Sequence, residues 1–115
     1  MAYDENLAER IRVSFQQKQV LFVEKKMMGG LCFMVNDKMC VGIVKNMLMA
    51  RIGPEVYEKA LLKEGCKEMT FTGKPMKGYV FVEPTAIDMD NDLDDWLKLS
   101  LDYNPKAKAS KKKRK

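Results

Sequence analysis

Histidine is absent from this chain of 115 residues. It is the side chain that most often acts as a general base near neutral pH and that most often binds metal ions. A serine or cysteine nucleophile would need another activating group, and Ser14, Ser100 and Ser110 lie in no nucleophile-elbow context. We therefore predict no enzyme, no catalytic residues, no cofactor, no metal site and no small-molecule substrate.

Cysteine is scarce as well. Cys32, Cys40 and Cys66 form an odd number at no spacing typical of a metal site, which favours reduced thiols over a disulfide framework. Each lies in or beside an apolar run. We interpret all three as small buried hydrophobic side chains, with a reactive thiol as the alternative.

No apolar stretch is long enough to cross a membrane. The longest run of apolar or glycine residues, Gly29 to Val35, falls far short of the roughly 18 residues that a membrane helix needs. The acidic start MAYDENLAER is unlike a signal peptide. We expect a cytoplasmic protein without membrane insertion, with one domain around a single core.

Acidic residues are missing from the end of the chain. Residues 104–115 carry seven of the 21 lysines and arginines and no acid, whereas residues 1–103 carry 14 basic and 16 acidic side chains. We therefore predict a domain at 1–103 and a disordered basic tail at 104–115, because the tail has nothing to bury. The candidate polyanion-binding residues of the tail are Lys106, Lys108, Lys111, Lys112, Lys113, Arg114 and Lys115.

Three roles are open for this tail. Positive charges on a flexible arm attract polyanions without reading a base sequence. No aromatic residue lies among the lysines, so the tail offers no platform on which bases could stack. The tail could contact nucleic acid or the ribosome, approach an anionic membrane, or remain solvated and aid solubility.

Apolar periodicity predicts three helices and about five strands. Apolar residues at helical spacing predict helices at 4–18, 54–64 and 92–103. Runs of β-branched and aromatic residues predict strands at 20–26, on both sides of Asn36-Asp37, at 47–52 and at 79–83. Residues 66–77 indicate mainly a loop, with a short extended piece at 68–71. The four consecutive strands imply an antiparallel meander, so the predicted class is two-layer α+β.

The central hairpin has a predicted register. Asn36 and Asp37 tolerate the positive φ of a two-residue type I′ turn. Such a turn places Val35 opposite Lys38, Phe33 opposite Cys40 and Leu31 opposite Gly42. The side chains of Leu31, Phe33, Val35, Cys40 and Val44 would then share one face, opposite those of Cys32, Met34, Met39, Val41 and Ile43. Neither face is polar, so we expect cover on both sides.

Aspartates alternate over residues 88–92 as in a calcium-binding EF-hand loop. Leu93 and Leu99 stand where that loop needs a glycine and a bidentate glutamate, and leucine binds no ion. We predict instead that Asp90 or Asn91 caps the third helix, with adventitious binding of a divalent ion as the alternative.

Two further features have a structural and a functional interpretation. Gly29-Gly30 beside two lysines could hold phosphate, but no phosphate-binding glycine pattern is present and a strand follows, so we predict a bend or bulge. Several of the ten methionines fall in or next to the meander: Met27, Met28, Met34, Met39, Met47 and Met49. They could fill the core or line an adaptable partner surface.

Four separated motifs together resemble the TfoX N-terminal domain family, whose founding members are bacterial competence regulators. The likeness covers essentially residues 4–103, and Met28 stands where the family usually has phenylalanine. The matching residues are Lys25, Lys26, Met27, Gly29, Gly30 and Leu31, then Arg51, Gly53 and Pro54, then Phe71, Thr72, Gly73, Met76, Gly78 and Tyr79, and finally Trp96.

This resemblance implies a small antiparallel sheet with helices, akin to secretion-chaperone-like folds, and a role in protein association without known catalysis. Larger competence regulators have a second, C-terminal helical domain where this chain has a basic tail. We expect a non-enzymatic interaction or transcription-regulatory accessory module that binds a second copy of itself or a protein partner. The alternative is a nucleic-acid-associated protein that works through the tail.

Overall fold

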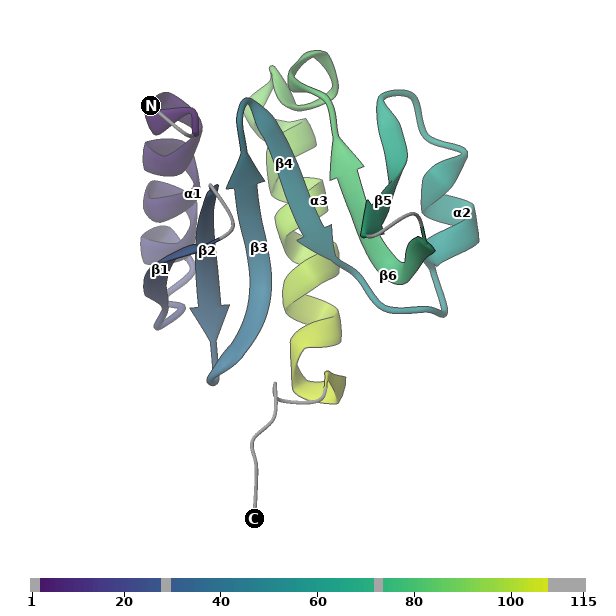
Figure 1. The fold of residues 1–115 in the computed structure, drawn as a ribbon. Coiled ribbons are helices and arrows are strands. Elements are labelled where there is room, and N and C mark those ends of the chain that lie inside the picture. The colour runs from purple at the N-terminus through teal and green to yellow at the C-terminus, as the bar shows by residue number, and fades with distance from the viewer. Residues whose placement is uncertain (1–2, 28–29, 72–73, 108–115) are drawn as a thin grey trace.

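The computed structural model describes residues 3–27, 30–71 and 74–107, which form one antiparallel sheet with helices packed on it (Figure 1). Its six strands lie in the order β1-β2-β3-β4-β6-β5. The predicted two-layer α+β class is confirmed. In chain order the elements are α1 (Glu5–Gln17), β1 (Val23–Met27), β2 (Gly30–Val35), β3 (Lys38–Val44), β4 (Met47–Arg51), α2 (Tyr57–Leu61), β5 (Cys66–Phe71), β6 (Lys74–Val82), the 3-10 turn η1 (Pro84–Ile87), α3 (Asp90–Tyr103) and the 3-10 turn η2 (Asn104–Lys106).

The first four strands form the predicted meander, each paired with the next. The sheet has one strand more than expected, because Cys66–Phe71 is a full strand rather than mainly a loop. β5 pairs with β6, which begins at Lys74, well before the predicted strand at 79–83. Glycine and proline in this segment favour a loop locally, whereas the pairing of β5 with β6 stabilises the extended chain.

α1 and α3 lie side by side on one face of the sheet (Figure 1). α1 matches its prediction, and Asp4 caps it by accepting hydrogen bonds at 2.9 and 3.2 Å from backbone N–H groups of the first turn. The predicted cap of α3 by Asp90 or Asn91 is wrong. Met89 occupies the N-cap position without a side-chain hydrogen bond, and Asp90 is already helical. Asp90 pairs instead with Arg10 of α1 at 3.2 Å, so a tertiary contact takes the place of a local cap.

The second helix is shorter than predicted. Residues 54–64 were expected to be helical, but α2 covers only Tyr57–Leu61. Tyr57 and Ala60 are buried and hold this single turn against the sheet. Gly65 follows with a φ of 81°, a left-handed conformation that suits the predicted glycine stop.

The hairpin turn is confirmed, but the predicted register beyond it is wrong. Asn36 and Asp37 have φ values of 55° and 64°, and Val35 pairs with Lys38 as expected. The register then shifts between Phe33 and Met34. The observed cross-strand partners are Val41 for Phe33 and Ile43 for Leu31, where Cys40 and Gly42 were predicted. β3 therefore contains a β-bulge, where it has one residue more than the paired segment of β2.

This bulge improves the core. In the regular register Cys40, Gly42 and Val44 would face the helices, and glycine has no side chain to bury. The shift turns Val41 and Ile43 toward the helices, where both are fully buried. Because each fully buried aliphatic side chain is worth about 1.5–3 kcal/mol, this gain outweighs an irregular ladder.

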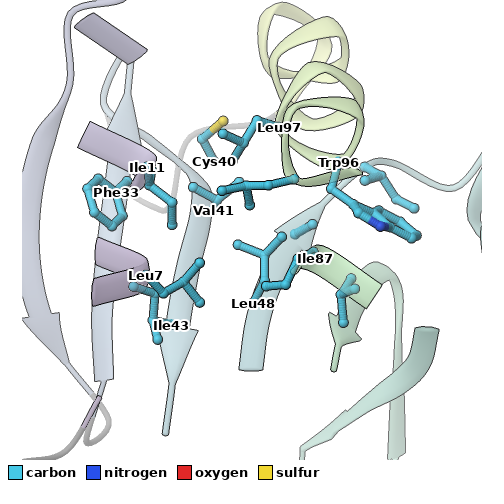
Figure 2. Packing of buried hydrophobic residues seen from close by; sticks show 14 of the residues in the cluster. Leu7, Ile11, Phe33, Cys40, Val41, Ile43, Leu48, Ile87, Trp96 and Leu97 are labelled. Carbon is cyan, nitrogen blue, oxygen red and sulfur yellow. The ribbon is translucent and has the colours of Figure 1, made fainter. Parts of the chain in front are cut away.

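The main core lies between the sheet and the helices α1 and α3. Figure 2 shows Leu7 and Ile11 of α1 on one side of this core, and Trp96 and Leu97 of α3 on the other. Beneath α1 three aromatic rings pack edge-on or tilted, with centroids 5.5 to 6.2 Å apart: Phe15, Phe22 and Phe33. Such ring geometry adds to the gain from burial.

The folded body continues beyond Tyr103, so the prediction of a disordered tail from residue 104 is wrong for residues 104–107. Asn104 is buried, and its side-chain amide donates to the carbonyl of Val35 at 3.0 Å. Its side-chain oxygen accepts from Asn36 at 2.8 Å, and its backbone carbonyl accepts from Lys38 at 3.1 Å. Asn104 thus ties the end of α3 to the β2–β3 hairpin. Residues 108–115 lie outside the described structure.

Replacing Asn104 by alanine tests this tie. Asn104→Ala leaves the carbonyl of Val35 without its buried donor, so we expect a loss of about 1–3 kcal/mol in the free energy of unfolding, measured by urea denaturation. The exposed turn residue Asn46 provides the control, and Asn46→Ala should change stability by less than about 0.5 kcal/mol. Equal urea midpoints for the two variants would show that the tie is unimportant.

Candidate interaction surface

The face of the sheet that points away from α1 and α3, called the open face below, carries two rows of side chains. Residues paired across antiparallel strands project from the same side of a sheet. The arginine row consists of Val23, Met34, Met39, Arg51 and Tyr79. The cysteine row consists of Lys25, Cys32, Gly42, Met49, Phe81 and Lys67.

The arginine row is accessible to solvent. Val23 on the edge strand β1 is 59% exposed, and the other members are half-buried. The cysteine row is more enclosed in its centre, because Cys32 and Met49 are buried. The methionines of the meander therefore differ in burial: Met49 is buried, while Met34 and Met39 are half-buried on the open face.

Arg51 connects strand β4 with two aromatic rings. Its guanidinium carbon lies 5.3 Å from the ring centroid of Tyr79 and 5.9 Å from that of Tyr103. A guanidinium nitrogen also donates to the carbonyl of Met39 at 3.5 Å. Burial raises the pKa of the Tyr79 hydroxyl, and the nearby charge of Arg51 partly opposes this rise. Cation–π contacts hold the guanidinium at the end of the arginine row.

Two motif glycines meet beside Arg51. Gly53 and Gly78 have φ values of 89° and 95°, which side chains rarely allow. The carbonyl of Gly78 accepts from the backbone N–H groups of Ile52 at 2.8 Å and Gly53 at 3.1 Å. A methyl group on Gly53 would collide with the ring of Tyr103. These glycines, together with Pro54, let the chain leave the sheet while β6 passes close by.

The other motif residues are not gathered at this corner. Lys25 and Lys26 have exposed side chains on β1, and a methyl group on Gly30 would collide with the carbonyl oxygen of Ile43. Trp96 is buried on α3, and Lys63 lies over its ring at 5.3 Å from the centroid. Met27 and Phe71 belong to the backbones of β1 and β5, whereas Gly29, Thr72 and Gly73 lie outside the described residues. The motif is thus spread over the sheet and α3.

The cysteines are poor nucleophiles. Burial raises the pKa of Cys32 and Cys66 to about 11 and that of Cys40 to about 12. All three are free thiols. In the part of the chain that the structure describes, no three histidine, cysteine, aspartate or glutamate side chains converge as metal ligands.

A polar cluster that the sequence did not predict lies between α1 and α3, beside a pocket of about 250 Å³. The buried Ser14 hydroxyl donates to Asp94 Oδ1 at 2.7 Å and accepts from Lys18 at 2.8 Å. The hydrogen bond from Ser14, followed by the one from Lys18, lowers the pKa of Asp94. Ser14 and Lys18 of α1 both contact the carboxylate of Asp94 on α3, so this cluster ties the two helices together.

Comparison with known protein families gives a match over most of the chain. The TfoX N-terminal domain matches residues 17–103. The chain belongs to the TfoX N-terminal domain family. The matched region begins at the last residue of α1, later than the residue 4 expected from the motifs, and includes the whole sheet and α3. No curated protein and no solved structure matches the chain.

The TfoX N-terminal domain is not a known enzyme family. Within the described ranges, no helix is long and apolar enough to span a membrane. The open face is the candidate site because its arginine row is accessible to solvent.

The corner at Gly53 gives a test of the motif. In Gly53→Ala the added methyl group meets the Tyr103 ring and the backbone keeps a left-handed φ. We expect the variant to lose about 2–4 kcal/mol of unfolding free energy, measured by chemical denaturation.

A double-mutant cycle with Tyr103→Ala separates the two causes. Without the ring, only the backbone penalty should remain, so Gly53→Ala should then cost about 1–2 kcal/mol. If the cost of Gly53→Ala is the same with and without the ring, contact with Tyr103 does not explain the glycine.

Proposed function

We propose that this TfoX N-terminal domain protein is a non-enzymatic protein-association module, acting as an accessory or regulatory protein in the cytoplasm. Its arginine row binds a second copy of the chain or a protein partner. The observation that carries this proposal is the continuous accessible row of apolar side chains, Val23, Met34 and Met39, that ends at Arg51 and Tyr79.

The composition of the row supports this function. Aromatic residues, methionine and arginine are enriched in protein interfaces, and methionine adapts its shape to a partner. The opposite face of the sheet is already covered by α1 and α3. The row also reaches the edge strand β1, where the exposed Val23 and the neighbouring Leu21, which is 90% exposed, extend the apolar surface.

A charge in the middle of the row should abolish association. We expect the full chain to form dimers at micromolar concentration in size-exclusion chromatography with light scattering, and Met39→Glu to be monomeric, because a carboxylate would be desolvated at the interface. The matched control is Leu62→Glu, a charge on an 86% exposed leucine outside the row, which should leave the dimer intact. A wild-type chain that is strictly monomeric and captures no partner by affinity purification would refute the proposal.

A second candidate function is binding of polyanions, nucleic acid in particular, through the basic tail. It is supported by the seven basic residues between Lys106 and Lys115 and by the anchored start of this segment at Asn104. Lys106 has a largely exposed side chain and makes only a long ion pair of 3.6 Å with Glu55. Such pairs contribute little stability, so Lys106 remains able to bind a phosphate.

Truncation after Ala107 tests the tail and leaves the tie of Asn104 in place. If all seven charges contact duplex phosphates, the logarithm of the affinity should fall with the logarithm of salt concentration at a slope near −6, and the truncated chain should lose nearly all of this dependence. DNA and RNA binding at low salt are measured by fluorescence anisotropy. Equal binding by both chains would assign any affinity to the body instead.

A further inference from the structure

The open face concentrates sulfur around the cysteine row. Cys32 and Met49 belong to this row, and Met69 of β5 is buried beside them. Met34 follows Cys32 on the same side of β2. The Cys32 thiol donates to the thioether sulfur of Met34 at a sulfur-to-sulfur distance of 3.6 Å. Three residues with sulfur side chains, Cys32, Met49 and Met69, thus lie together, although β2, β4 and β5 are far apart in the sequence.

A small cavity lies at this spot. It has a volume of about 30 Å³, and Cys32, Met49 and Met69 line it. Its other lining residues are glycine or aliphatic and have no side-chain nitrogen or oxygen. Gly42, directly opposite Cys32, has no side chain, and the methyl carbon of Met49 occupies the space above it. The cavity exceeds the roughly 10–15 Å³ that a single water needs, so one metal ion fits.

The chemistry of the lining selects the ligand. Thiolate and thioether sulfur are soft ligands that prefer Cu(I), whereas magnesium and calcium need oxygen ligands. A thiolate and a monovalent cation together are neutral, which reduces the cost of burying the ion.

We propose that Cys32, Met49 and Met69 form a binding site for one Cu(I) ion on the open face. On binding, the S–H bond of Cys32 breaks, a sulfur–copper bond forms, and the proton passes to solvent. No electron is transferred, because copper enters and stays as Cu(I). The site contacts the arginine row only where the Cys32 thiol donates to Met34, and it does not depend on protein association.

The test is an anaerobic competition titration of the full chain with Cu(I) against the chromogenic chelator bicinchoninate. We expect one Cu(I) per chain and a complex with only sulfur neighbours in X-ray absorption. Met49→Leu and Met69→Leu keep the apolar volume but remove a ligand, so each should weaken binding by roughly 10- to 100-fold, and Cys32→Ala by more.

Three matched controls should bind Cu(I) like the wild type. Met89→Leu removes an exposed thioether, Cys40→Ala removes a buried thiol in the helix-side core, and Cys66→Ala removes the most accessible thiol. Circular dichroism verifies that each variant is folded. Unchanged affinity in both folded leucine variants, loss of binding in Cys66→Ala, or nitrogen and oxygen neighbours of the copper would overturn the proposal.

Discussion

The bulge in β3 determines how the sheet divides its side chains between its two faces. Because the register shifts between Phe33 and Met34, Val41 and Ile43 face the helices, and Gly42 faces the open side. Val41 and Ile43 join Phe33 in the core on the helix side of the sheet. The open face receives a glycine in its centre, and the space above Gly42 accommodates the side chain of Met49. One additional residue in a strand thus sets both the core and the surface.

The arginine row and the cysteine row of the open face differ in how deeply their side chains are buried. The arginine row keeps accessible methionine, arginine and tyrosine side chains, which suit a protein interface. The neighbouring cysteine row is buried in its centre, where three sulfur-bearing side chains line part of a small pocket. Methionine occurs in both rows because its flexible thioether can pack in a core, adapt to a partner or bind a soft metal ion.

The family motif has a structural explanation in this chain. Gly53 and Gly78 allow β4 and β6 to approach each other at a corner, where Arg51 lies near Tyr79 and Tyr103. Gly30 makes room for the backbone of β3. These residues shape the backbone beside the open face.

The sequence by itself determined the helix periodicity, the turn at Asn36-Asp37, the meander and the family, because these depend on local spacing and backbone preference. Only the tertiary structure decided the bulge at Cys40, strand β5 and the burial of Asn104. Each of these depends on partners distant in the sequence: the helices over Val41, the strand β6 and the hairpin carbonyl of Val35. The sulfur cluster depends on the same distant contacts, since strand pairing and burial bring Met49 and Met69 to Cys32.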